Sequence, residues 1–370
     1  MPGPAAGTAH AATTTDVVCL GESMVTFLPS QPGRLADVPS FGRGIGGAES
    51  NVACALAAAG HRAAWVGRVG ADGFGDHLVE TIAGYGVDTS AVRRDPDRPT
   101  GIYFRTATDR GAGAHEVAYY RAGSAASAMS PSNVPYGEVF AGRILHLSGI
   151  TAALSGDCLA LLRELTAERP GRPLVSFDVN HRPHLWRGGD ASVLLELARR
   201  SDLVFVGEDE AEEAWGIVGA EAIRAALPEP SVLVVKRGSA GATVFSGLRP
   251  GPRSSNAGGA EDAAAGTGSG DTVTHVPALH VDVVAAVGAG DAFAAGFLSA
   301  TLRGLPVRDR VRHGHLMAAA VLTVPGDLTE PPARDHADRL AALDDGAWGR
   351  LRLGPGWTAA DRAPEEVRTS

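Results

Sequence analysis

Residues 286–297 read AVGAGDAFAAGF, so a glycine-rich turn, a carboxylate and a run of small residues follow one another directly. The small residues are typical of a closely packed helix, and Gly288, Ala289 and Gly290 let the backbone approach a ligand. Their N–H groups would open that helix at the positive end of its dipole, where a phosphate is favoured. Asp291, at this turn, could accept the proton of an attacking hydroxyl. The alternative is an ordinary strand-to-helix loop with Asp291 as a first-turn helix acid.

A second glycine cluster, GIGGAESNVACALAAAG at residues 44–60, also precedes an alanine-rich helix. Gly46 and Gly47 would let a polyol lie close to the bare backbone, and Asn51 near the first turn could donate and accept hydrogen bonds. The alternative is a tight turn with close helix packing. By itself this segment leaves both interpretations open.

The composition is that of an ordinary globular enzyme, with 370 residues, 44% hydrophobic and 20% charged. This length favours one large α/β domain with a small appendage. The formal net charge of −9 makes the chain a poor nucleic-acid binder, although a few converging arginines could hold an anionic substrate. Neither a run of about 20 apolar residues nor a secretory signal occurs, so we expect no membrane span and a cytoplasmic protein. Cys19, Cys54 and Cys158 lack metal-ligand spacing and are predicted to be buried, reduced thiols.

Short β-type runs alternate with helical patterns along most of the chain. The predicted strands are 17–20, 64–67, 144–147, 174–178, 203–206 and 232–236, and the predicted helices include 51–59, 156–168, 191–200 and 208–215. This alternation predicts an α/β fold with a mostly parallel central sheet and helices on both faces. Ligands of such sheets bind beyond the carboxyl ends of the strands.

Several segments differ from this alternation. Residues 101–106 and 117–121 are typical of two antiparallel strands joined by a flexible loop. The low-complexity stretch 247–271 is predicted to be a flexible insert between two edge strands, without a catalytic role. Residues 1–15 and 354–370 are predicted to be a disordered leader and a disordered tail, which leaves 16–353 as the folded domain.

Several motifs in one order resemble the ribokinase-like, PfkB-type carbohydrate kinases, and within that family the 2-keto-3-deoxygluconate kinases. The resemblance runs from about Asp16 to about Ala333. Besides the two glycine clusters, its pieces are GESM at 21–24, VGRVGADGFGD at 66–76, YYRAGSA at 119–125, HLSGI at 146–150, DVNHR at 178–182, LW at 185–186 and KRG at 236–238. It implies a ribokinase-like fold with a small β-sheet lid whose strands lie within 22–42 and 100–122.

The resemblance also implies an activity, the ATP-dependent phosphorylation of a sugar's terminal hydroxyl. Asp291 would be the general base, and the turn of Gly288, Ala289 and Gly290 would form the anion hole. Mg²⁺ is expected with the nucleotide, with Glu210 acting on it through water. The nucleotide-binding positions implied are Lys236, Gly238, Gly241, Gly290 and His315.

Lys236 and Glu210 also have interpretations without a function. Lys236 would then be part of a solvated basic strand end, and Glu210 part of a solvated acidic helix start.

On the sugar side, the positions implied are Gly46, Gly47, Asn51, Tyr103, Tyr119, Arg121 and Arg182. A guanidinium binds a carboxylate through two parallel charge-assisted hydrogen bonds, so the two arginines favour a sugar acid such as 2-keto-3-deoxygluconate. For each tyrosine, packing within the core or lid is the alternative. A kinase of fructose, another neutral sugar or a nucleoside stays open, as does a non-catalytic sugar-binding regulator. The expected partners are the sugar acid and ATP, with no nucleic acid or membrane, and a second copy of the chain is possible through the lid strands.

Three positions depart from the family pattern. Ala285 stands where most relatives carry an acidic residue, so a monovalent-cation site could be lost. Gly207 stands where many have asparagine, which leaves the metal environment open, and His315 stands where an asparagine next to the adenine is common. Ala285 and Gly207 motivate the regulator alternative, but the intact Asp291 argues against it.

Overall fold

The computed structural model describes residues 15–106, 116–187, 189–247 and 270–359. Within them, an eight-stranded sheet has the order β14-β13-β12-β11-β10-β9-β1-β4. From β4 to β12 neighbouring strands are parallel, and β13 and β14 add an antiparallel edge. The strands are β1 (Thr15–Leu20), β4 (Ala63–Val66), β9 (Gly142–Ser148), β10 (Leu174–Asp178), β11 (Leu203–Gly207), β12 (Val232–Lys236), β13 (Ala242–Ser246) and β14 (Thr272–Val276).

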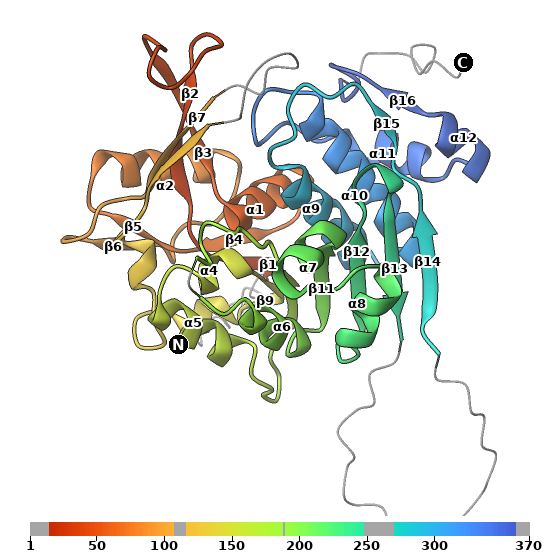
Figure 1. Ribbon diagram of the computed structural model, residues 1–370, viewed down its shortest axis with the longest axis horizontal. Coiled ribbons are helices and arrows are strands. Elements are labelled where there is room, and N and C mark those ends of the chain that lie inside the picture. Colours follow the sequence, from red (N-terminus) through yellow and green to blue (C-terminus); the bar gives the residue numbers. More distant parts are fainter. Residues whose placement is uncertain (1–14, 107–115, 188, 248–269, 360–370) are drawn as a thin grey trace, which may run out of the picture.

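Helices cover both faces of this sheet, which explains why its strands are apolar without alternation. Val17 and Cys19 of β1 belong to the hydrophobic core that also holds residues of α1 (Ala48–Ala58), α9 (Ala289–Leu302) and α10 (Val307–Leu322). Val18 and Leu20 point to the other core, which α5 (Gly156–Leu165), α6 (Ser192–Arg199), α7 (Glu208–Trp215) and α8 (Ala220–Ala226) complete. Figure 1 shows this second set, α5 to α8, gathered on one side of the sheet.

A separate four-stranded sheet, here called the lid, has the order β3-β2-β7-β8. Its strands are β2 (Met24–Pro29), β3 (Phe41–Gly46), β7 (Ile102–Arg105) and β8 (Val117–Tyr120). In Figure 1, β2, β3 and β7 rise away from the central sheet at the upper left. Tyr103 and Tyr119 are paired across β7 and β8, so both side chains lie on one face of the lid. Phe104 lies on the opposite face, where its ring stacks on Phe27 at 4.7 Å.

The remaining elements connect these sheets. They are α2 (Gly73–Gly84), α3 (Tyr136–Val139), α4 (Gly149–Ala152), α11 (Arg334–Ala341), α12 (Asp345–Arg350), the 3₁₀ turns Ala126–Ala128 and Gly238–Ala240, and the short strands β5 (Arg68–Gly70), β6 (Arg93–Asp95), β15 (His280–Val281) and β16 (Arg352–Leu353). Among the described residues, no helix is both long and apolar enough to cross a bilayer.

The predicted α/β architecture is confirmed, and the differences lie at its boundaries. Thr15, assigned to the leader, is the first residue of β1, where it pairs with Gly142. The helix predicted to reach residue 168 ends at Leu165, and Thr166 follows as its C-cap, with a hydroxyl that donates to the Leu162 carbonyl at 2.8 Å. The described chain continues past 354 to residue 359, and Trp357 packs on the core.

Two further predictions concern the insert and the cysteines. Most of the predicted insert, 248–269, lies outside the described residues, and β13 and β14 flank it. The three cysteines are free and buried, as predicted.

Candidate active site

The glycine-rich turn lies where α9 begins. Gly288 is the residue before the first helical turn and has φ +79°, a left-handed conformation that side chains other than glycine's rarely adopt. A Cβ atom there would also lie 2.6 Å from the carbonyl oxygen of Asp327. The turn therefore depends on glycine at 288 for two reasons, and it presents the free N–H groups of α9 toward a pocket.

This pocket has a volume of about 320 Å³ and opens beyond the carboxyl ends of β10 and β12. A larger cavity of about 590 Å³ lies among α1, α9, α10 and α11, but none of the predicted site residues lines it. The predicted residues that line the smaller pocket are Gly47, Asn51, Tyr119, Arg182, Glu210, Lys236, Gly288, Gly290 and Asp291. Those outside its lining are Gly46, Tyr103, Arg121, Gly238, Gly241, Ala289 and His315.

Asp291 lies in the first turn of α9 with its carboxylate in this pocket. Its Oδ2 accepts a hydrogen bond from the side-chain amide of Asn51 at 2.8 Å, which joins the two glycine clusters of the sequence. The pKa of Asp291 is raised from 3.8 to about 7, chiefly by burial and also by the neighbouring Asp178, against the opposing effects of Asn51, Arg182 and Lys236. A carboxylate with such a pKa can take up a proton near neutral pH.

Lys236 brings a positive charge to the same turn. Its Nζ lies 3.1 and 3.2 Å from the two carboxylate oxygens of Asp178, and a Cβ atom at Gly290 would lie 3.7 Å from it. Burial alone would lower the pKa of Lys236, but Asp178, Glu210 and Asp291 raise it overall, so the ammonium is charged. A cation and free amides at one turn form a site for an anion.

Glu210 lines the pocket from the first turn of α7. Its Oε2 accepts a hydrogen bond from the Gly207 N–H at 2.8 Å, and its Oε1 lies 3.5 Å from Arg182. A Cβ atom at Gly207 would overlap Asp209 Oδ1 and would lie 3.1 Å from Glu210 Cγ. Among the described residues, no group of three or more His, Cys, Asp or Glu side chains could hold a metal ion.

Gly241 and His315 meet at the end of β14, outside the pocket lining. A Cβ atom at Gly241, where φ is +102°, would overlap the Val276 carbonyl oxygen. His315 Nε2 lies 3.3 Å from that same oxygen, and burial lowers the pKa of this histidine to about 4, so its ring is neutral. A role for these residues at a nucleotide stays a prediction.

Tyr103 attaches the lid to the body of the protein. Its hydroxyl donates to Asp327 Oδ2 at 3.1 Å, and the guanidinium of Arg105 lies 2.6 Å from Asp327 Oδ1, with all three side chains buried. A Cβ atom at Gly46 would overlap the Tyr103 hydroxyl, which accounts for that glycine. The hydroxyl predicted to hold the sugar is thus engaged by Asp327, a residue of the pocket lining.

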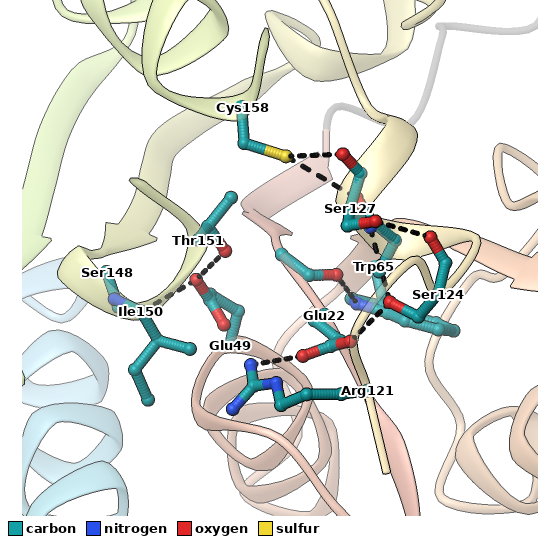
Figure 2. Close-up of polar contacts among 12 residues, drawn as sticks. Glu22, Glu49, Trp65, Arg121, Ser124, Ser127, Ser148, Ile150, Thr151 and Cys158 are labelled. Carbon is teal, nitrogen blue, oxygen red and sulfur yellow. Dashed lines mark hydrogen bonds and ion pairs between the residues drawn. The ribbon is translucent and has the colours of Figure 1, made fainter. Parts of the chain in front are cut away.

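The two arginines predicted to hold a carboxylate differ in their surroundings. Arg182 lines the pocket with 45% of its side chain exposed. Arg121 is 10% exposed and pairs with Glu22, which also accepts a hydrogen bond from Ser124 at 2.9 Å (Figure 2). Arg121 therefore lies behind the pocket wall, over the ring of Tyr119, and differs from the prediction in having an internal carboxylate partner.

Sequence reasoning assigned no role to several residues that shape the site. Asp178 is the last residue of β10 and Asn180 lies two residues beyond it, so their position at the end of a buried strand was the available signal. Asn180 has φ +42°, unusual for a residue other than glycine. Glu49 is buried and accepts hydrogen bonds from Ser148 and Thr151, both at 2.8 Å (Figure 2). These bonds fix the start of α1, and hence Asn51.

Comparison with known proteins agrees with this geometry. Residues 14–334 match the pfkB family of carbohydrate kinases. A 2-dehydro-3-deoxygluconokinase from Bacillus subtilis is 33% identical over 327 residues, covering 86% of this chain and 93% of that protein. A probable chloroplastic fructokinase from Arabidopsis thaliana is 28% identical, with 82% and 75% covered. The crystal structure of a PfkB protein from Polaromonas superposes with a TM-score of 0.72 at 30% identity, covering 89% of this chain and all of that one. The chain therefore belongs to the pfkB family of carbohydrate kinases.

Proposed function

We propose that this carbohydrate kinase phosphorylates the terminal hydroxyl of a sugar acid, 2-keto-3-deoxygluconate, with ATP as the phosphoryl donor. The observation that carries the proposal is the position of Asp291, whose carboxylate faces the pocket beside the turn of Gly288 and Gly290. A base and an anion-binding turn side by side suit the transfer of a phosphoryl group to an alcohol.

In this mechanism, Asp291 accepts the proton of the attacking hydroxyl, and Asn51 holds the carboxylate in place through its amide. The amides at Gly288 and Gly290 and the ammonium of Lys236 stabilise the negative charge that develops on the migrating group. Asp291 is ionised to a useful extent near pH 7 and, once protonated, can release the proton to solvent through the pocket.

The residues of the pocket fit a nucleoside triphosphate with Mg²⁺. Lys236 and the turn at 288–290 would hold the phosphates, and Glu210 would face the cation through water. ATP would supply the phosphoryl group when bound. Since no cluster of three metal-binding side chains occurs in the described residues, most of the cation's ligands would come from phosphates and water.

The preference for an acid rests on Arg182. Its guanidinium is half exposed within the pocket and lies 3.5 Å from Glu210, at the long end of an ion pair, so it can turn to a substrate carboxylate. The names of relatives support both an acid and a neutral sugar, since 2-dehydro-3-deoxygluconokinases and fructokinases both match this chain.

The test is an assay of ADP release over a panel that holds 2-keto-3-deoxygluconate, fructose and ribose, each with Mg²⁺ and ATP. We expect the sugar acid to have the highest kcat/KM. Arg182→Ala should lower kcat/KM for the acid by 10-fold or more, the share of one charge-assisted pair, and change the value for fructose little. Arg339→Ala, at an exposed position on α11, is the matched control.

Two outcomes would contradict the proposal. If fructose is preferred and Arg182→Ala affects both sugars equally, the chain is a neutral-sugar kinase. If sugar binds by calorimetry but none stimulates ADP release, the chain is a non-catalytic regulator.

A further inference from the structure

A ring stack connects the lid to the body of the protein at the pocket. The Tyr119 ring, on β8 of the lid, lies 4.7 Å from the His184 ring with an angle of 14° between their planes. His184 belongs to the segment that follows β10, the strand that ends at Asp178. Tyr119 also lines the pocket, so one ring of the stack forms part of its wall.

This stack is a weaker attachment of the lid than the one through Asp327. The stronger one is the buried group of Tyr103, Arg105 and Asp327, which joins β7 to the body through an ion pair and a hydrogen bond. Tyr119 is 39% exposed, and its contact with His184 is the stacking of the two rings. If the lid opens, the stack should separate first because it holds no charge pair and solvent reaches it.

Positive charge surrounds the ring of His184. Burial lowers the pKa of this histidine, and Arg121, Arg182 and Arg187 lower it further. Glu22 pairs with Arg121 and Glu210 lies 3.5 Å from Arg182. These effects favour the neutral imidazole, and its buried Nε2 has no hydrogen-bond partner among the described residues.

We propose that His184 is a positioning residue that latches the lid through its stack on Tyr119, and that an anionic sugar in the pocket preserves this latch at low pH. The second part rests on the proposed function. A carboxylate beside Arg182 offsets the positive charge around the ring, whereas a neutral sugar leaves it in place. Below the ordinary pKa of histidine, the latch thus favours acids without a contact from His184 to the substrate.

The same geometry sets a direction for pH. Protonation of His184 adds a positive charge to a site that faces Arg121, Arg182 and Arg187, so the closed lid holds fewer protons than an open one. Closure is complete above the ordinary pKa of an exposed histidine and weakens as the pH falls below it. A bound carboxylate opposes this loss, so the binding of an acid should depend less on pH than the binding of a neutral sugar.

The test measures sugar binding by calorimetry in the absence of ATP, with 2-keto-3-deoxygluconate and fructose as probes at pH 7.5 and 5.5. His184→Ala should weaken binding by about two- to tenfold, the range for one aromatic pair. His184→Phe keeps a flat ring and should bind as the wild type does at pH 7.5, but without the additional weakening at pH 5.5. His336→Phe, on α11 near Trp357, is the matched control and should change neither value.

A double-mutant cycle separates the latch from a general structural role. Tyr119→Ala loses its own contacts with the pocket, but adding His184→Ala to it should cost nothing further, because the stack is already absent. Fully additive losses, or the same pH dependence in wild type and His184→Phe, would overturn the proposal. If the acid does not bind but fructose does, the proposed substrate fails while the fructose series still decides the latch. If Asp291-dependent turnover of the acid persists without any effect of His184→Ala, the latch alone fails.

Discussion

Replacement of Asp291 by asparagine is the sharpest test of the site, because the structure predicts opposite effects on activity and stability. The pKa of Asp291 is raised from 3.8 to about 7 by burial and by Asp178. A base must be ionised to accept a proton, so kcat/KM of the wild type should rise with pH through about 7. For one group with this pKa, the ionised fraction is about 0.1 at pH 6 and about 0.9 at pH 8, which gives a roughly ninefold rise.

Stability follows the opposite sign. A carboxyl whose pKa is raised in the folded state favours folding while it is protonated, and this contribution is lost as the pH rises from about 4 through about 7. The shift of about three units corresponds to at most about 4 kcal/mol at pH 8, and solvent in the pocket reduces this value. Asp291→Asn keeps an oxygen for the Asn51 amide and removes the charge, so it should be as stable as the wild type at pH 5 and more stable at pH 8.

The measurements are ADP release from pH 5.5 to 8.5 and guanidinium unfolding at pH 5 and 8. Asp291→Asn should lower kcat at least 100-fold, because a general base usually contributes a factor of this size to the rate. Asp335→Asn, an exposed acid in the first turn of α11, controls for loss of a helix acid and should retain full activity. Activity of Asp291→Asn within tenfold of the wild type, or a wild-type profile that is flat between pH 6 and 8, would refute the assignment of the base.

Three further variants test the parts that support the site. Arg105→Ala leaves the buried Asp327 without its cation, so the free energy of unfolding should fall by about 3–5 kcal/mol in denaturant titrations. A loss below about 1 kcal/mol is expected for an exposed ion pair and would contradict a buried one. Gly288→Ala places a side chain at φ +79° against Asp327, so we expect a lower melting temperature and a lower kcat in the ADP-release assay. An unchanged melting temperature and kcat would show that the turn tolerates a Cβ atom. Gly21→Ala would overlap the Glu49 carboxyl and should cost about 1–3 kcal/mol by the same denaturant titration, whereas a neutral effect would mean that Glu49 can move aside.

Much of the fold could be predicted from the sequence because the buried strands are continuous apolar runs bounded by polar residues. The strand at 174–178 is an example, since both of its faces are covered and apolar residues therefore do not alternate with exposed polar ones. The ends of elements were less predictable. The start of α1 at Ala48 rather than Asn51 depends on Glu49, an acidic residue that is buried because Ser148 and Thr151 donate to it from elsewhere in the chain.

The candidate site divides in the same way. Asp291 and its turn are local in sequence, so a short motif predicted them. Asp327 was not predicted because its role depends on Arg105, 222 residues away, and on a lid strand whose pairing no local pattern fixes. The partner of Arg121 was missed for a related reason. Glu22 lies within a quoted motif, but its contact with Arg121 exists only once β2 and the end of β8 share one sheet.

Charge pairing within the pocket indicates why Asp291, rather than another acid, suits the role of base. The pocket holds four carboxylates, and three of them have a cation within 4 Å, namely Asp178 with Lys236, Glu210 with Arg182 and Asp327 with Arg105. Among the described residues, the hydrogen-bond partner of Asp291 is instead the neutral amide of Asn51. A neighbouring cation opposes the effect of burial on a carboxylate, and the pKa of Asp291, which is hydrogen-bonded to a neutral amide, is raised to about 7, so that this group can accept a proton near neutral pH. The arrangement of partners, more than proximity to the turn, therefore distinguishes the base from the acids that hold the site together.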